Sequence, residues 1–171
     1  MRLQRNTGRK NHRQLLDELI RRSERCVLCS GWLKHAGLKL LLPAIDDAIA
    51  RGAQVLVYSN RQHTEAEAAT ALYAREGVRH MIADDEIRYL HTKLYYFENG
   101  ERYTAVIGSA NITKGGLVDN EECSVVLSGK IGDAGQAEID AYLTALPLAL
   151  RQPISKKRPP KNTWPMPATD R

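Results

Sequence analysis

The residues of this chain best suited to chemistry lie between positions 91 and 122: His91, Lys93, Ser109, Asn111 and Glu122. A neutral imidazole can attack phosphorus, and an ammonium beside it can hold the non-bridging oxygens of a phosphate. Alternate side chains of a strand share a face, so we expect His91 and Lys93 to project together from one strand. Ser109 and Asn111 add neutral hydrogen-bond donors, and we expect Glu122 to bind the far ring nitrogen of His91 and fix its tautomer. These five residues are the predicted catalytic set for phosphoryl transfer without a metal.

The spacing of these residues matches a known signature. His91-x-Lys93-x-x-x-x-Glu98, followed by Gly108-Ser109-x-Asn111 and Asn120-x-Glu122, resembles the HKD signature of the phospholipase D superfamily. The run GSANITKGGLVDNEE (108–122) is similar to the single-motif, Nuc-like endonuclease branch. The resemblance implies a single α/β domain with a mixed β-sheet sandwiched between helices. It also implies that one histidine attacks phosphorus to give a phosphohistidine, that a second histidine protonates the leaving oxygen, and that water releases the product with no metal or cofactor.

This chain carries only one such motif. None of its other histidines is followed two residues later by lysine: His12, His35, His63 and His80. Longer members of the family carry two motifs in one chain, so the resemblance implies that the second motif comes from a twin. A two-fold axis places identical residues face to face. We therefore expect a homodimer that completes the active site across its interface.

Two features depart from a simple match. Glu98 stands where the signature has Asp, and strand parity points it away from His91, so we predict a salt-bridge or turn residue there. Asn99-Gly100 is a strong hairpin signal. A two-residue turn at that pair would place His91 opposite Gly108 and direct Ser109 to the wrong face. The prediction therefore requires a bulge or kink at Gly108, which glycine permits.

Helices and strands that must position this site alternate in the first half of the chain. The hydrophobic pattern predicts helices over 14–25, 38–51 and 65–76 and strands over 26–32, 54–58 and 78–83. Pro43 is expected to start or kink the second helix, and Thr64 is expected to cap the third. Such alternation indicates a parallel sheet covered on both faces. From about residue 89 strand follows strand, over 90–97, 103–108 and 123–127. A last helix over 133–146 is expected to end at Pro147.

Other patterns favour structure over chemistry. Cys26 and Cys29 form a C-x-x-C inside a buried strand, which predicts core cysteines rather than a zinc or redox site. The acidic pairs 46–47 and 84–85 lie on a helix and in a turn with no histidine nearby, so we expect no two-metal centre. Trp32 and Tyr58 are expected to pack in the core or at a strand end rather than to stack on bases. Arg61 and His63 follow a strand end, where open α/β sheets bind ligands, which is only a hint of function.

Basic residues gather at the two ends of the chain. Residues 1–13 hold five basic residues and no acid, residues 151–171 hold six against one acid, and the segment between them has an excess of acid. We interpret 1–13 as a basic arm, 14–150 as the catalytic domain and 151–171 as a Pro-rich tail that we expect to be disordered. Such charge suits a polyanion, because phosphate neutralisation releases counterions, although a solubilising tail is the alternative. The predicted nucleic-acid-binding residues are Lys114, Lys156, Lys157 and Arg158.

Length and composition fit one globular domain. The chain has 171 residues, with 43% hydrophobic and 26% charged residues and a net charge of +5. It shows no signal peptide and no apolar run of roughly 20 residues, and its three cysteines cannot all pair, so we expect a cytoplasmic protein without a membrane partner. The predicted function is a metal-independent phosphodiesterase or endonuclease acting on nucleic acid, DNA ahead of RNA. The alternatives are a phospholipid phosphodiesterase of the same family and a non-catalytic nucleic-acid-binding module.

Overall fold

The predicted alternation of helices and strands is present in the first part of the chain. The computed structural model describes residues 1–8 and 10–152. Along the chain it forms α1 (His12–Arg22), β2 (Arg25–Ser30), α2 (His35–Leu38), α3 (Leu42–Ala50), β3 (Gln54–Asn60), α4 (Ala66–Tyr73) and β4 (Val78–Ala83). Pro43 lies in the first turn of α3, as predicted, because the missing N–H costs nothing there. Thr64 does not cap α4, since its hydroxyl donates to Asn60 O and the cap position falls on Glu65.

The second part of the chain is dominated by antiparallel strands. It contains β5 (Lys93–Asn99), β6 (Arg102–Gly108), the π-helical turn η1 (Gly115–Asp119), β7 (Cys123–Lys130) and α5 (Ala134–Ala149). The helix α5 continues through Pro147, contrary to the predicted end at that residue. The proline lies in the last turn, where one lost backbone hydrogen bond is tolerated, and Leu150 N still donates to Leu146 O.

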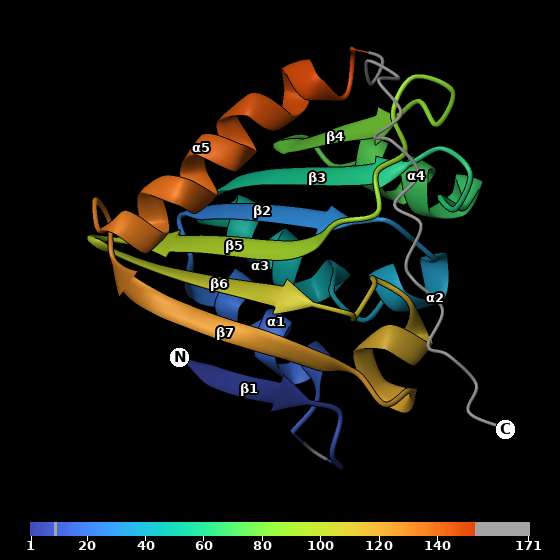
Figure 1. Ribbon diagram of the computed structural model, residues 1–171. Helices are drawn as coiled ribbons and strands as arrows, with labels where there is room; N and C mark the ends of the chain where they lie inside the picture. Colours follow the sequence, from blue (N-terminus) through green and yellow to red (C-terminus); the bar gives the residue numbers. More distant parts are fainter. Residues whose placement is uncertain (9, 153–171) are drawn as a thin grey trace, which may run out of the picture.

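The seven strands of the described residues, which include β1 (Arg2–Arg5), form one mixed sheet in the order β1-β7-β6-β5-β2-β3-β4. The strands β2, β3 and β4 pair in parallel, and every other pairing is antiparallel. At one edge the carboxyl ends of β2, β3 and β6 therefore meet the amino ends of β5 and β7, on the right of Figure 1. We call this the site edge, marked by Ser30, Asn60, Lys93, Gly108 and Cys123.

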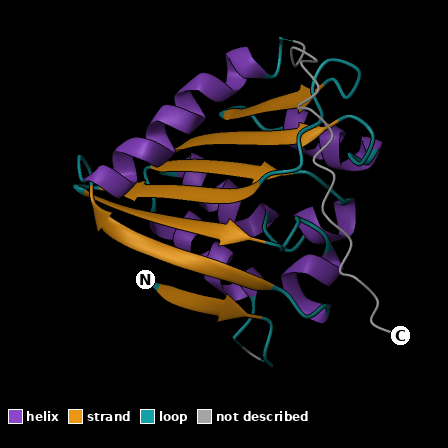
Figure 2. Cartoon of the chain, in the orientation of Figure 1, coloured by secondary structure: helices purple, strands orange, loops and turns teal. Residues whose placement is uncertain are grey.

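The sheet is covered on both faces, which confirms the predicted α-β-α sandwich. Figure 2 shows α5 crossing one face and the remaining helices lying behind the other. Along β5, Leu94 and Tyr96 pack in the cluster that includes α5, whereas Tyr95 and Phe97 pack in the cluster of α1 and α3. Burying one leucine or phenylalanine side chain contributes roughly 1.5–3 kcal/mol, so this two-sided burial fixes the register of β5.

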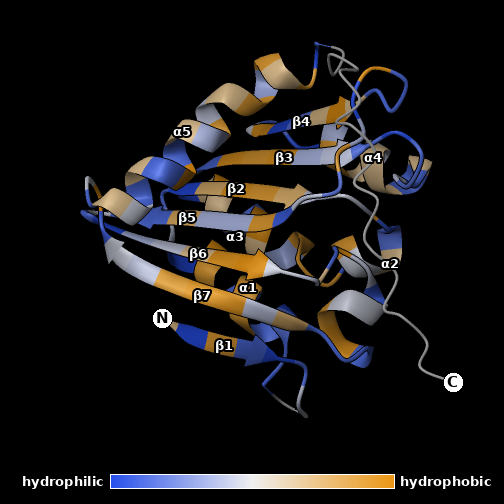
Figure 3. Ribbon diagram, in the orientation of Figure 1, coloured by the Kyte–Doolittle hydropathy of each residue, from blue (hydrophilic) through white to orange (hydrophobic). Residues whose placement is uncertain are grey.

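The N-terminal basic segment contains a β-strand. Within the predicted arm 1–13, β1 (Arg2–Arg5) pairs antiparallel with β7, and Arg5 forms an ion pair with Glu121 at 2.7 Å. β1 is hydrophilic in Figure 3, whereas the strand interiors next to it are hydrophobic, so backbone pairing at the sheet edge accounts for its place better than burial. The predicted tail is described only at 151–152; its other residues, 153–171, lie outside the described part of the chain.

The β5–β6 hairpin differs from the predicted register. Asn99 pairs with Arg102, so the turn consists of Gly100 and Glu101, with φ +54° at Gly100. The same register places Lys93, rather than His91, at the level of Gly108. A shift of two residues leaves strand parity unchanged, so the register alone does not turn Ser109 toward Lys93. Instead β6 ends at Gly108, and Ser109 lies beyond the strand.

Glu98 takes the structural role predicted for it. Its carboxylate accepts hydrogen bonds from Arg25 at 2.7 Å and from the Tyr96 hydroxyl at 2.8 Å. Arg25 also contacts Asp140 of α5 at 3.1 Å. These groups lie on the α5 face at the end of β5 remote from Lys93, so Glu98 joins the helix to the sheet.

Candidate active site

His91 and Lys93 meet at the site edge of the sheet. The Lys93 ammonium lies 3.1 Å from Nδ1 and 3.0 Å from Nε2 of His91, and 2.9 Å from its carbonyl oxygen. Because the ammonium is equally close to both ring nitrogens, it does not single out either of them as an acceptor. His91 is exposed and Lys93 is partly buried. Burial lowers the pKa of Lys93, and the negative charge of Glu122 opposes that shift.

The backbone around His91 is held by the ends of two neighbouring strands. β5 begins at Lys93, so His91 precedes the strand instead of lying on it as predicted. Gly31 N donates to Thr92 O at 3.0 Å, and a Cβ on Gly31 would lie 3.1 Å from the His91 Cα. Asn60 Nδ2 donates to the carbonyl of the buried Leu90 at 3.0 Å. A close backbone approach thus keeps His91 facing outward with Lys93.

Ser109 and Glu122 form a second pair at this edge. Ser109 directly follows β6, and its hydroxyl donates to the Glu122 carboxylate and accepts from Cys123 N at 3.1 Å. Within the described part of the chain, Glu122 bonds to Ser109 and not to the ring of His91, so the predicted contact is not formed. The strand order gives the reason: β6 lies between β7, which Glu122 precedes, and β5.

Asn111 is fixed so that its oxygen faces the protein. Oδ1 accepts from Trp32 N at 3.0 Å and lies 3.5 Å from Ser30 Oγ. The NH2 group of the planar amide points to the opposite side, where it can donate to a substrate oxygen. Gly116 permits this arrangement, since a Cβ there would lie 2.5 Å from the Asn111 carbonyl oxygen.

The predicted nucleic-acid-binding residues are only partly described. Lys114 is exposed at the start of η1, with its ammonium 3.7 Å from Asp119. Lys156, Lys157 and Arg158 lie outside the described residues. The structure therefore places one of the four next to the Asn111 loop.

Sequence reasoning missed a buried histidine that supports the site. Asn6 Nδ2 donates to the carbonyls of Gly116 and Asn120, which turns its Oδ1 toward His12 Nδ1 at 2.7 Å. Nδ1 therefore carries the proton, and Nε2 accepts from the Ser124 hydroxyl at 2.8 Å. Burial lowers the pKa of His12. This network ties the N-terminal segment to η1 and to the strand that follows Glu122; the only sequence signal was a histidine at the start of an amphipathic helix.

The cysteines behave as the sequence predicted. Cys26 and Cys29 are buried within β2, and burial raises the pKa of each thiol to about 12. Such thiols are core residues rather than reactive groups. In residues 1–8 and 10–152, no group of three or more His, Cys, Asp or Glu side chains is arranged to hold a metal ion. No helix within those ranges is long and apolar enough to cross a bilayer.

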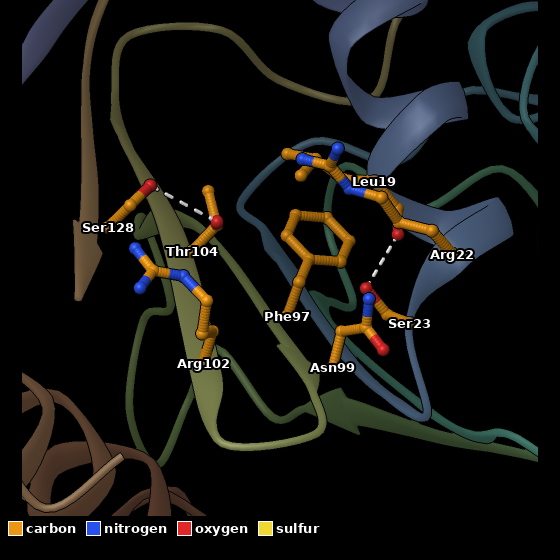
Figure 4. Close-up of a pocket in the computed structure, with 8 residues that line it drawn as sticks. All are labelled: Leu19, Arg22, Ser23, Phe97, Asn99, Arg102, Thr104 and Ser128. Atoms are coloured by element: carbon orange, nitrogen blue, oxygen red, sulfur yellow. Dashed lines mark hydrogen bonds between the residues drawn. The ribbon is translucent and has the colours of Figure 1, made fainter. Parts of the chain in front are cut away.

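A cavity of about 280 Å³ lies away from these residues. Figure 4 shows it at the hairpin end of β5 and β6, where Ser23 donates to Leu19 O at 2.6 Å and Thr104 bonds Ser128 at 3.2 Å. Its lining also includes Arg22, Phe97, Asn99 and Arg102. Because β5 and β6 carry Lys93 and Gly108 at their other ends, this cavity is separate from the site edge.

The fold and the site edge together define a phospholipase D-like enzyme. Residues 15–145 match the family described as "Cardiolipin synthase, PLD-like domain", and the chain belongs to this phospholipase D-like family. The predicted class of enzyme, a phosphodiester hydrolase, is the class to which such domains belong. Among curated proteins, no sequence matches the chain.

Several solved structures share the fold at low identity. The phospholipase D family member Nuc from Salmonella typhimurium has a TM-score of 0.64 and 18% identity over 88% of this chain and 93% of its own. NucT from Helicobacter pylori has a TM-score of 0.61 and 14% identity over 80% of this chain and 87% of its own. A mutant of the yeast tyrosyl-DNA phosphodiesterase has a TM-score of 0.59 and 16% identity over 90% of this chain but only 39% of its own. This chain thus corresponds to nearly all of Nuc and to less than half of the yeast enzyme.

Proposed function

We propose that the chain hydrolyses phosphodiester bonds in nucleic acid, DNA ahead of RNA, through a phosphohistidine formed at a dimer interface and without a metal ion. The observation that carries the proposal is the contact between the Lys93 ammonium and the ring of the exposed His91, 3.0–3.1 Å away. A phosphate drawn to that ammonium lies beside an imidazole nitrogen that can attack it.

The proposed reaction has two steps. A ring nitrogen of His91 bonds to phosphorus while the bond from phosphorus to the leaving oxygen breaks, and the His91 of the partner protonates that oxygen. Water, losing a proton to the partner's His91, then attacks phosphorus and releases His91. Lys93 stabilises the non-bridging oxygens throughout, and the Asn111 amide donates to them. Ser109, held by Glu122, completes this set of polar groups.

Charge and similarity both favour nucleic acid as the substrate. The chain has a net charge of +5, with basic residues concentrated at its two ends. Each phosphate that a lysine or arginine neutralises releases counterions and strengthens binding. One structure with the same fold is a tyrosyl-DNA phosphodiesterase by name. A DNA phosphodiester is therefore the substrate that we propose, and the cytoplasmic location stays a prediction.

The family description supports one other candidate function. It names cardiolipin synthase, which acts on a phospholipid, and the same histidine chemistry can cleave or transfer a lipid phosphodiester. Release of a headgroup from phospholipid vesicles, with no cleavage of nucleic acid, would establish that candidate in place of the first.

The decisive experiment combines chelation with a matched pair of variants. Purified protein is incubated with plasmid, single-stranded DNA and RNA in EDTA, alongside His91→Ala and Glu98→Gln. We expect the wild type and Glu98→Gln to cut DNA in EDTA, because Glu98 lies at the far end of β5, and His91→Ala to be inactive. Cleavage that appears only after a divalent metal is added would contradict the proposed mechanism.

A further inference from the structure

A row of four rings leads away from the candidate nucleophile. The ring of His91 stacks on Tyr89, with centroids 5.8 Å apart and planes at 25°. Tyr89 meets His63 edge-on at 6.3 Å, and His63 lies 4.6 Å from Trp32 with planes at 32°. We call these residues, His91, Tyr89, His63 and Trp32, the aromatic row.

Three rings of the aromatic row, Trp32, Tyr89 and His91, are exposed, and His63 is partly buried. Trp32 is 40% exposed and Tyr89 is 43% exposed, whereas Tyr95, Tyr96 and Phe97 are each at most 1% exposed. Leu90, between Tyr89 and His91, is buried, so its two neighbours both face outward. The sequence predicted core or strand-end packing for Trp32. Its ring is not in the core but lies just past the carboxyl end of β2, where it packs on His63 and stays partly exposed.

Backbone contacts hold the aromatic row rigidly beside the catalytic residues. The buried Asn60 accepts from His63 N at 2.8 Å and donates to Leu90 O at 3.0 Å, so one side chain fixes both His63 and the segment of Tyr89. Trp32 N donates to Asn111 Oδ1 at 3.0 Å. The candidate phosphate-binding residue Asn111 thus also anchors the far end of the row.

We propose that the aromatic row stacks on unpaired bases, and that the preferred substrate is a single strand. The inference rests on the proposed function, because the row begins at His91, where the scissile phosphate would lie. Flat exposed rings bind bases of any sequence by stacking, and only unpaired bases present a free face. In a duplex both faces of each base are covered by its neighbours.

The surroundings of the row favour bases over lipid. Two of its four rings are imidazoles, which are polar, and polar groups are disfavoured in a bilayer. Two basic residues close to Trp32 and His63 along the chain, Lys34 and Arg61, are paired with Glu65 at 3.7 Å and Asp84 at 3.0 Å. Arg88, which directly precedes Tyr89, is partly buried. The Trp32 and His63 end of the row therefore offers ring faces, and Lys93 supplies the cation at the His91 end.

Trp32 itself can report the contact. The chain has two tryptophans, Trp32 and Trp164, so Trp164→Phe leaves Trp32 as the single emitter. On ice, to limit turnover, we expect oligothymidylate to quench this fluorescence. The same strand annealed to oligoadenylate should quench it much less. The Kd for the single strand should be lower than the Kd for the duplex at equal salt.

Variants separate stacking from electrostatic binding. Trp32→Ala and Tyr89→Ala should each raise the Kd for oligothymidylate by about five-fold or more, while Tyr89→Phe keeps the ring and the affinity. Tyr73→Ala is the control: it removes a tyrosine of α4 that is 65% exposed, and it should leave the Kd for oligothymidylate unchanged. Because stacking releases no counterions, the slope of log Kd against log salt should stay the same in Trp32→Ala.

The outcomes distinguish this inference from the proposed function. If the protein cuts DNA but treats both strand forms alike, and neither ring variant weakens single-strand binding, the inference fails and the proposed function stands. Quenching of Trp32 by the single strand without any cleavage would support base stacking by the aromatic row and would overturn the proposed hydrolysis of nucleic acid. A Trp32 response to vesicles of anionic phospholipid, with none to oligothymidylate, would overturn both.

Discussion

At the scale of single residues, the proposed chemistry depends on His91 and Lys93. His91→Ala should lower kcat by several orders of magnitude, since the loss of a nucleophile normally costs many decades. Binding of duplex DNA should be nearly unchanged, because we expect the basic ends of the chain to supply most of it. Single-turnover kinetics and a gel-shift titration measure the two quantities. A variant that keeps more than about a tenth of the wild-type rate would remove His91 from its assigned role.

His80 makes a separate prediction about stability. Its Nε2 bonds to Ser59 Oγ at 2.9 Å, its Nδ1 has no hydrogen-bond partner among the described residues, and burial lowers its pKa from 6.5 to about 4. The unfolded chain therefore binds this proton more readily than the folded one. The neutral His80 side chain therefore makes its full contribution to the free energy of unfolding above about pH 6.5. This contribution is lost as the pH falls toward 4.

The matched measurement for His80 is a series of Tm values between about pH 5 and pH 7. His80→Gln should flatten the fall of Tm on acidification, even if its Tm at neutral pH is lower. His12, whose pKa burial also lowers, remains in this variant and will keep part of the slope. An identical slope in His80→Gln and wild type would show that the imidazole of His80 stays accessible to protons.

The candidate catalytic residues were chosen from their spacing in the sequence, but not all of their contacts follow from that spacing. Residues two apart, as His91 and Lys93 are, meet through local geometry alone. Glu122 and Ser109 meet because β7 lies beside β6, and their partnership follows from the strand order rather than from any spacing. The aromatic row was missed for the same reason, since Trp32, His63 and Tyr89 come from three separate loops.

At the scale of elements, the close approach of β2 to the segment before β5 positions His91, the candidate nucleophile. Gly31→Ala would place a Cβ 3.1 Å from the His91 Cα and 3.2 Å from Leu90 O. The backbone of His91 must then shift by a few tenths of an ångström or more. We expect kcat to fall by roughly 10- to 100-fold, because misplaced reacting groups lose rate steeply. Circular dichroism should show an intact fold, and a folded variant with wild-type kcat would contradict this role for Gly31.

Helices and strands with strong hydrophobic patterns were predictable, and short or weakly patterned ones were not. The strand β4 matches its predicted bounds, 78–83, and Pro43 correctly marks the start of α3. By contrast, β1 has only one buried residue in four, Gln4, so it carries no alternating pattern to read. η1 arises where close packing against Asn111 requires Gly116, which sequence spacing alone does not reveal.

The C-terminal segment is the element predicted to strengthen DNA binding. Removing residues 153–171 deletes Lys156, Lys157, Arg158, Lys161 and Arg171. Each phosphate contact contributes about −0.9 to the slope of log affinity against log salt, so the truncated protein should bind more weakly and with a flatter slope. Its single-turnover rate at saturating DNA should be unchanged. An unaltered slope would make this segment a solubilising tail.

At the scale of the whole molecule, the proposal requires two chains. One His91 supplies a nucleophile but no acid for the leaving oxygen. Among the other described histidines, His12 is fully buried and His80 is partly buried on β4. His35 begins α2, and the ring of Tyr89 lies between His63 and His91. A two-fold axis near the site edge would bring a second His91 and Lys93 opposite the first. An asymmetric substrate then gives identical residues different roles. Such a dimer should bury on the order of 1,200 Å² or more in total.

Subunit mixing tests this arrangement directly. Wild-type protein and His91→Ala protein are combined in varying ratios and allowed to exchange subunits before activity is measured. If each site needs both copies of His91, heterodimers are inactive, and activity should fall as the square of the wild-type fraction. Mixing with Glu98→Gln is the control and should leave activity near its starting level, because Glu98 lies at the remote end of β5. A linear fall with His91→Ala, or full activity from a chain shown to be monomeric, would mean that a single chain holds both the nucleophile and the acid.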